Sequence, residues 1–348
     1  MALNDRHNLS RRDVLKGIAA AAAGAALPAG TLLAQNGSGA QGIVDVHQHF
    51  TLPGGRGATR DWSIEKVLDL MGKNGISTVI FSNAGNGEQI YAGTDAARDL
   101  CRRMNDFLAK TVSDHPKSFG FFAVIPFPDA DASLKELEYA YGALKADGVG
   151  ILSSINEKYP GDPLFRPAWE EMNRRKAVTF MHPYTPRCCR TLIQSGEASV
   201  ERDFDTTRAV TNLLYSGTLS ELPDIRYIIN HSGADVPVMA GRIKDRVPGA
   251  SSFGAKPQTD GITAKTPKGA FYELQKLYYE CAHAAYAPAI AALRAFVPPS
   301  QMLFGSDFPA EDPANTIAEL KKRDLPPDVQ HALYRGTAEH LFPRLKAS

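Results

Sequence analysis

A short apolar stretch at residues 43–50 contains two histidines separated by one residue, His47 and His49. Residues two apart in a β-strand point to the same side, so both imidazoles would face one point if this stretch is a strand. Two ring nitrogens directed at one point are half of the ligand set of a typical zinc site. The pair therefore predicts a metal site, provided that the rest of the chain supplies the other ligands.

The chain after residue 42 alternates between short apolar runs and segments with helical spacing. The runs, expected to be strands, cover 42–46, 78–82, 119–125, 149–152, 178–181, 226–229, 277–280 and 302–304. The helical segments cover 63–71, with Ser63 as the expected N-cap, then 95–112, 133–145, 167–176, 204–219, 288–296 and 328–341. This alternation predicts one domain over residues 42–348 with an α/β fold, a (β/α)8 TIM barrel.

The active site of such a barrel lies at the carboxyl ends of its strands, and several candidate ligands occur there. His182 follows the fifth run, His231 the sixth and Asp307 the eighth, while His283 comes just after the seventh. Each residue alone is more typical of a structural role, such as a hydrogen-bonded histidine or a helix cap. Combined with the histidine pair of the first run, their order predicts a metal site at the ends of the strands.

The motifs at these strand ends resemble those of the amidohydrolase-related superfamily, and most of all its aminocarboxymuconate-semialdehyde decarboxylase branch. They are Asp45-x-His47-x-His49, Phe180-Met181-His182-Pro183, Asn230-His231-Ser232-Gly233 and Phe304-Gly305-Ser306-Asp307-Phe308-Pro309. Segments 119–126, 148–152 and 162–169 are similar to those of the 6-methylsalicylate decarboxylase-like members. The resemblance extends from residue 42 to the end of the chain.

This resemblance implies a ligand set and one further functional histidine. It implies that the metal is bound by His47, His49, His182 and Asp307, and that His231 acts on the substrate or on metal-bound water. Dinuclear relatives carry a bridging lysine after the fourth strand, where this chain has Ser153 and Ser154, so one metal is expected. Zn²⁺ is the expected ion, and Mn²⁺ or Fe²⁺ would also suit these donors.

The resemblance also implies that the protein is a homodimer in which Arg242 reaches across the interface to a substrate carboxylate. The alternative for Arg242 is an ordinary surface charge on a helix. Tyr184, Phe308 and Trp62 are candidates to stack on an aromatic substrate or to pack in the core. His283 is a candidate to bind the substrate or to cap the helix that follows it.

Three functions are compatible with these residues. A decarboxylase of a small aromatic or muconate-like acid, such as a 6-methylsalicylate-type acid, must protonate the carbon that loses CO2, and His231 or Asp307 would donate that proton. A hydrolase of a lactone, amide or ester would use metal-bound hydroxide, with one of the same residues as the base. A non-catalytic exported binding protein is the third possibility. The resemblance favours the decarboxylase.

The remaining composition limits the partners. The 348 residues carry a formal net charge of +1, which gives no electrostatic basis for binding nucleic acid, so the expected ligand is a small carboxylate. The four cysteines lack CxxC spacing, and the adjacent pair Cys188 and Cys189 is expected to be free thiols. Lining the substrate pocket and binding metal are both open as roles for this pair.

Residues 1–34 have the pattern of an export signal, and 35–41 that of a linker. The sequence Ser10-Arg11-Arg12-Asp13-Val14-Leu15-Lys16 precedes an alanine-rich apolar run and resembles a bacterial twin-arginine signal, although Val14 replaces the usual phenylalanine. A membrane anchor is the alternative, but Pro28 and Gly30 interrupt a run that is short for a membrane span. We therefore expect recognition by the twin-arginine export machinery, cleavage at Ala34 or Ala40, and a periplasmic or otherwise exported protein.

Overall fold

Eight parallel strands form one sheet in the order of the chain. The computed structural model describes residues 42–346 except 54–61, 84–86, 193–199 and 250–259, so the expected signal and linker lie outside the described residues. The strands are β1 (Ile43–His49), β2 (Ile76–Ser82), β3 (Phe119–Val124), β4 (Gly148–Leu152), β5 (Val178–His182), β6 (Arg226–Ile229), β7 (Tyr278–Glu280) and β8 (Met302–Leu303). All eight predicted strands are confirmed, with small shifts at their ends.

The sheet closes on itself because the segment that begins with β8 pairs with β1. The backbone N–H of Val46 donates to the carbonyl of Phe304 (3.1 Å), and that of His49 donates to the carbonyl of Phe308 (2.8 Å). Between them, the N–H of Asp307 donates to the carbonyl of His47 (2.7 Å). The predicted (β/α)8 barrel is therefore confirmed.

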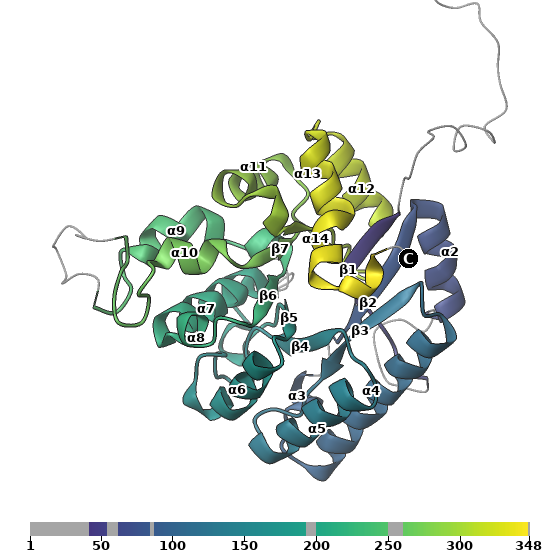
Figure 1. Cartoon of the computed structure of the whole chain (residues 1–348), viewed down its shortest axis with the longest axis horizontal. Helices are drawn as coiled ribbons and strands as arrows, with labels where there is room; N and C mark the ends of the chain where they lie inside the picture. Colours follow the sequence, from purple (N-terminus) through teal and green to yellow (C-terminus); the bar gives the residue numbers. More distant parts are fainter. Residues whose placement is uncertain (1–41, 54–61, 84–86, 193–199, 250–259, 347–348) are drawn as a thin grey trace, which may run out of the picture. The chain divides into compact units, whose positions relative to one another are not determined.

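Helices surround the strands, as Figure 1 shows for the described part of the chain. They are α2 (Ile64–Asn74), α3 (Gly87–Ile90), α4 (Asp95–Asp114), α5 (Ala130–Gly142), α6 (Arg166–Arg174), α7 (Glu201–Ser216), α8 (Thr218–Glu221), α9 (Val236–Lys244), α10 (Ala270–Gln275), α11 (Ala287–Phe296), α12 (Pro313–Lys321), α13 (Pro327–His331) and α14 (Thr337–Leu341). Among these, no helix is long and apolar enough to cross a lipid bilayer.

The helix predictions were right for the longer helices and incomplete for the short ones. Ser63 caps α2 as predicted, since its Oγ accepts a hydrogen bond from the N–H of Lys66 (3.3 Å). Helices α3, α9, α10 and α12 were not predicted, because four to nine residues give too few turns for a clear apolar periodicity. The single helix predicted over 328–341 is instead α13, a π-helical turn at Ala332–Gly336, and α14.

An apolar cluster inside the barrel lies directly beneath the candidate ligands. Phe122 of β3 stacks on Phe180 of β5 with ring centroids 5.3 Å apart, and Phe342 contacts Phe122 from the C-terminal segment. Phe180 in turn meets the imidazole of His47 edge to face at 4.8 Å. The aromatic side chains exclude water from one side of His47, which strengthens the electrostatic interactions of that imidazole.

Candidate metal centre

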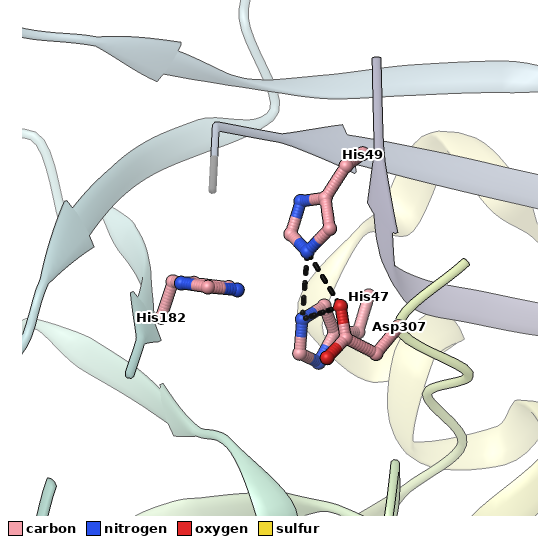
Figure 2. Close-up of side chains that lie close together, drawn as sticks. All are labelled: His47, His49, His182 and Asp307. Atoms are coloured by element: carbon pink, nitrogen blue, oxygen red, sulfur yellow. Dashed lines mark hydrogen bonds and ion pairs between the residues drawn. The ribbon is translucent and has the colours of Figure 1, made fainter. Parts of the chain in front are cut away.

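Four side chains from the ends of β1, β5 and β8 converge on one point at the mouth of the barrel (Figure 2). They are His47, His49, His182 and Asp307, and their ligand atoms all lie within 4.8 Å of one another. The Nε2 atoms of His47 and His49 are 3.2 Å apart, and Asp307 Oδ1 lies 3.3 Å from the first and 2.7 Å from the second. The structure thus brings together the four predicted ligands.

His182 shows most directly that this cluster fits a cation. Its side chain is buried, and neither ring nitrogen has a hydrogen-bond partner among the described residues. Burial, together with the neighbouring His49 and His47, holds the pKa of His182 well below its ordinary value, so its ring is neutral. A buried neutral imidazole without a partner is costly unless something binds it. Three imidazoles and one carboxylate match the donor set of a mononuclear divalent-metal site.

The ligand rings are themselves held in place by buried groups. Glu280, at the end of β7, places Oε1 2.9 Å from His47 Nδ1 and accepts a hydrogen bond from the backbone N–H of His231, also at 2.9 Å. Burial alone would raise the pKa of Glu280, but His47 lowers it, so Glu280 is a carboxylate. Such a carboxylate fixes the ring so that Nε2 faces the metal. Glu280 was noted in the sequence only as a strand end.

His231 lies beside the four ligands and is oriented by a residue that the sequence did not reveal. Its Nδ1 is 2.7 Å from Oδ1 of Asp203, in the first turn of α7, and its Nε2 is 3.7 Å from Oδ2 of Asp307. Burial would lower the pKa of His231, but Asp203 and Asp307 raise it to about 9. Both carboxylates thus favour the protonated form of His231, whose ring lies beside the metal cluster. An aspartate in a helical segment carries no local signal for such a contact.

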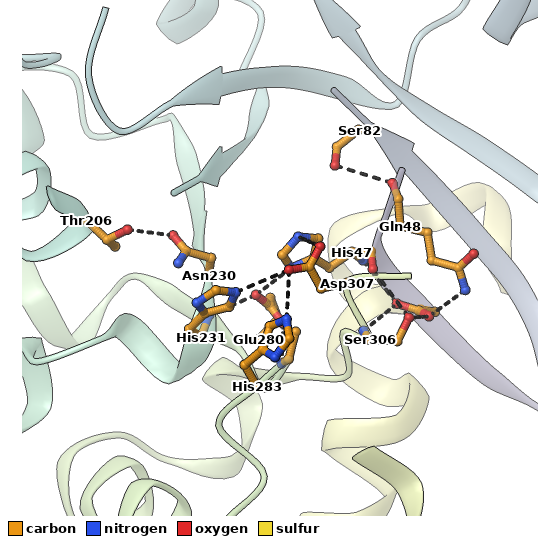
Figure 3. Close-up of polar contacts among 12 residues, drawn as sticks. His47, Gln48, Ser82, Thr206, Asn230, His231, Glu280, His283, Ser306 and Asp307 are labelled. Carbon is orange, nitrogen blue, oxygen red and sulfur yellow. Dashed lines mark hydrogen bonds and ion pairs between the residues drawn. The ribbon is translucent and has the colours of Figure 1, made fainter. Parts of the chain in front are cut away.

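His283 also reaches the cluster. Its Nε2 is 3.0 Å from Asp307 Oδ2, and its Nδ1 is 3.0 Å from Oε2 of Glu311. The alternative role as a helix cap is wrong, because α11 begins after Tyr286 and no side chain of the described residues caps it. Figure 3 shows His231, His283, Glu280 and Asp307 gathered together.

The three aromatic residues predicted as candidates to stack on the substrate differ in their contacts. Tyr184 is partly buried after β5, and its hydroxyl accepts a hydrogen bond from Arg190 (2.9 Å). Phe308 is partly buried next to Asp307, while Trp62 packs against Phe81 in the core.

Arg242 and the cysteine pair, which were also candidates from the sequence, do not contact the four candidate ligands in any hydrogen bond or ion pair of the described residues. Arg242 is exposed on α9, where it lines an outer groove with Tyr215 and Met239. Cys188 and Cys189 are free cysteines, with their sulfurs 2.7 Å apart.

Comparison with known proteins adds a family to this geometry. Residues 44–344 match a family model described as amidohydrolase, and residues 8–28 match one for the twin-arginine translocation signal sequence. The chain is 32% identical over 324 residues to the 6-methylsalicylic acid decarboxylase of Penicillium expansum. The aligned region covers 87% of this chain and 97% of that protein.

Two solved structures have the same fold. One is a 2,6-dihydroxybenzoate decarboxylase in complex with 2,6-dihydroxybenzoate, with a TM-score of 0.75, 22% identity, and coverage of 87% of this chain and 99% of that one. The other is a dihydroxybenzoic acid decarboxylase from Polaromonas sp. JS666 with bound manganese and the inhibitor 2-nitroresorcinol. Its TM-score is 0.74 at 21% identity, with coverage of 88% of this chain and 98% of that one.

Replacing His182 by Ala should remove bound metal, because the variant lacks one of the four donors. Elemental analysis of purified protein should find about one divalent ion per chain in the wild type and a small fraction of that in His182→Ala. His340→Ala, which removes an exposed imidazole from α14, is the control and should keep its metal. Full metal content in His182→Ala would refute the ligand role of His182.

Proposed function

The chain belongs to the amidohydrolase family and is one of its metal-dependent decarboxylases, and we propose that its substrate is a small aromatic acid with a hydroxyl group beside the carboxylate. The observation that carries this proposal is the pair formed by His231 and Asp307. After four donors are assigned to the metal, one further buried imidazole still faces the site, and Asp203 favours its protonated form. A decarboxylase needs such a proton donor next to its cation.

The divalent ion would be held by His47, His49, His182 and Asp307, and we propose that it is Zn²⁺. Three imidazoles and one carboxylate suit Zn²⁺, while the manganese in the Polaromonas enzyme shows that a related fold accommodates another divalent ion. When bound, the ion would supply positive charge that stabilises the carboxylate and hydroxyl oxygens of the substrate. The side chains around the ion would donate the proton and bind the substrate.

The proton comes from the pair of His231 and Asp307. Decarboxylation forms a new C–H bond at the carbon that bore the carboxylate, and the electrons of the broken C–C bond stay with the ring. His231 Nε2 and Asp307 Oδ2 lie 3.7 Å apart and face the same space, so a proton on this pair can reach a ring carbon placed beside them. Because protonation of the ring carbon must precede the loss of CO2, the reaction requires this pair to lie next to that carbon.

We propose that the substrate ring lies between residues from several strand ends. Tyr184 after β5 and Phe308 after β8 offer aromatic faces, and His283 offers a polar edge beside Asp307. Arg242 would contribute only from a partner subunit in a homodimer, because within its own chain it lines an outer groove.

Incubation with aromatic acids tests the proposed reaction. Metal-loaded protein should release CO2 and the matching phenol from 6-methylsalicylate and 2,6-dihydroxybenzoate. It should release far less from 4-hydroxybenzoate, whose hydroxyl cannot lie beside the carboxylate. His182→Ala is the matched inactive control. Opening of a lactone or amide without any CO2 would make the protein a hydrolase, and no turnover with either class would leave only a binding role.

Exchange of Asp203 for Asn should slow the reaction without loss of metal. Asn lacks the negative charge with which Asp203 stabilises the protonated ring of His231, so the pKa of His231 falls and less imidazolium is present to donate a proton. We expect kcat to fall about 10-fold to 100-fold with little change in KM or metal content. Asp69→Asn, which alters an exposed carboxylate of α2, serves as the control. An unchanged kcat in Asp203→Asn would contradict the orienting role of Asp203.

We also propose that residues 1–34 are a cleaved signal and that the mature protein is periplasmic. The match to the twin-arginine signal at residues 8–28 supports export by that pathway. Conversion of both Arg11 and Arg12 to Lys should leave uncleaved precursor in the cytoplasm of a bacterial host, as judged by fractionation and immunoblotting. Lys16→Arg is the control: it is also an exchange between lysine and arginine, but it lies outside the arginine pair, so this variant should be exported normally. Normal export of the double variant would contradict this proposal.

A further inference from the structure

A second group of possible ligands adjoins the first and shares one carboxylate with it. Oδ1 of Asp307 faces His47 and His49, whereas Oδ2 lies 3.0 Å from Nε2 of His283 and 3.7 Å from Nε2 of His231. Ligand atoms of His231, His283 and Asp307 all lie within 4.8 Å of one another. The two oxygens of one carboxylate are thus directed at two separate pairs of imidazoles.

Both imidazoles of this second group are held from behind by carboxylates. Asp203 lies 2.7 Å from Nδ1 of His231, and Glu311 lies 3.0 Å from Nδ1 of His283. A carboxylate on Nδ1 places the lone pair of a neutral imidazole on Nε2, which is the usual arrangement behind metal-binding histidines. His231 is 8% exposed, and its Nε2 has no hydrogen-bond partner among the described residues. The second group therefore combines converging nitrogens with a buried ring nitrogen that no hydrogen bond satisfies within the described part of the chain.

We propose that His231 Nε2, His283 Nε2 and Asp307 Oδ2 form a second, weaker site for a divalent ion such as Zn²⁺. Two imidazoles and a carboxylate form a three-ligand set that leaves a position for water, as in exchangeable zinc sites. This location differs from the second site of dinuclear relatives, which depends on a lysine after β4, where this chain has Ser153. In this site Asp307 would bridge the two ions.

The second ion should bind more weakly than the first and should inhibit the enzyme. It has one protein ligand fewer, and it is repelled by the ion already bound on the other side of Asp307. Binding requires the lone pair of His231 Nε2, so an occupied second site has no proton on that atom. The inhibition, unlike the binding, rests on the proposed decarboxylation.

Metal binding alone tests the site without reference to activity. Equilibrium dialysis against increasing Zn²⁺, followed by elemental analysis, should show one tight equivalent and a second that is at least about tenfold weaker. The full chain is used without an affinity tag and with both Cys188→Ser and Cys189→Ser, because the thiol pair could bind zinc itself. A single equivalent up to millimolar Zn²⁺ would overturn the proposal.

Three variants assign the second equivalent to these residues. His283→Asn should abolish it while the first equivalent remains; Asn also tolerates the positive φ of 52° found at this position. Glu311→Gln retains the ring of His283 and should weaken the second equivalent by about tenfold. His340→Asn removes an exposed imidazole elsewhere and should change neither. If the second ion binds equally well to His283→Asn and Glu311→Gln, it lies elsewhere and the proposal fails.

Activity in excess Zn²⁺ completes the experiment. CO2 release should fall as the second equivalent binds, and Glu311→Gln should require about tenfold more Zn²⁺ for the same inhibition. Full activity with two equivalents bound at these residues would overturn the inhibitory role. A protein that binds two ions as described but never releases CO2 would refute the proposed function and leave the second site standing.

Discussion

Closure of the barrel between its last and first strands is the constraint on which the metal centre depends. Asp45 of β1 is fully buried, and its Oδ2 accepts a hydrogen bond from the hydroxyl of Ser306 (2.6 Å) while Oδ1 accepts one from the N–H of Ser306 (3.1 Å). The next residue, Asp307, donates its N–H to the carbonyl of His47. A carboxylate ligand and an imidazole ligand 260 positions apart in the chain thus become neighbours because one buried aspartate joins two strands. Loss of this contact would leave buried donors unsatisfied and would also separate the ligands.

The backbone around the site is strained where the side chains must turn inward. His231, His283 and Asp307 all have positive φ values, between 49° and 65°, a region that such residues rarely adopt. Each such conformation costs of order 1–3 kcal/mol and persists only where the surroundings enforce it. Here the hydrogen bonds to Glu280 and His47, together with contacts of the imidazoles with carboxylates, offset this cost. The strain thus marks the residues that converge on Asp307.

The sequence was sufficient for the barrel and for the ligands because both depend on local patterns. Apolar runs of three to seven residues are visible without a structure, and His47, His49, His182 and Asp307 come within three residues after the ends of such runs. Asp203 and Glu311 could not be found in this way. Both are common residue types in segments without a motif. Asp203 contacts His231, and Glu311 contacts His283, only because the barrel brings different βα segments together at one face. The short helix α9 was missed for a related reason, and with it the position of Arg242 on the outer groove.

The same four ligands would serve hydrolysis or decarboxylation, so the choice of reaction must lie in the groups behind them. A hydrolase requires a base that removes a proton from water, and a base must be unprotonated at working pH. His231 has the opposite character here, because Asp203 and Asp307 stabilise its protonated form despite its burial. Decarboxylation consumes one proton in each turnover, and in the proposed reaction a protonated imidazole next to the carboxylate of Asp307 would provide it where it is used. One oxygen of Asp307 faces His49 and the other faces His231, so in the proposed reaction this single residue would join the site of the cation to the source of the proton.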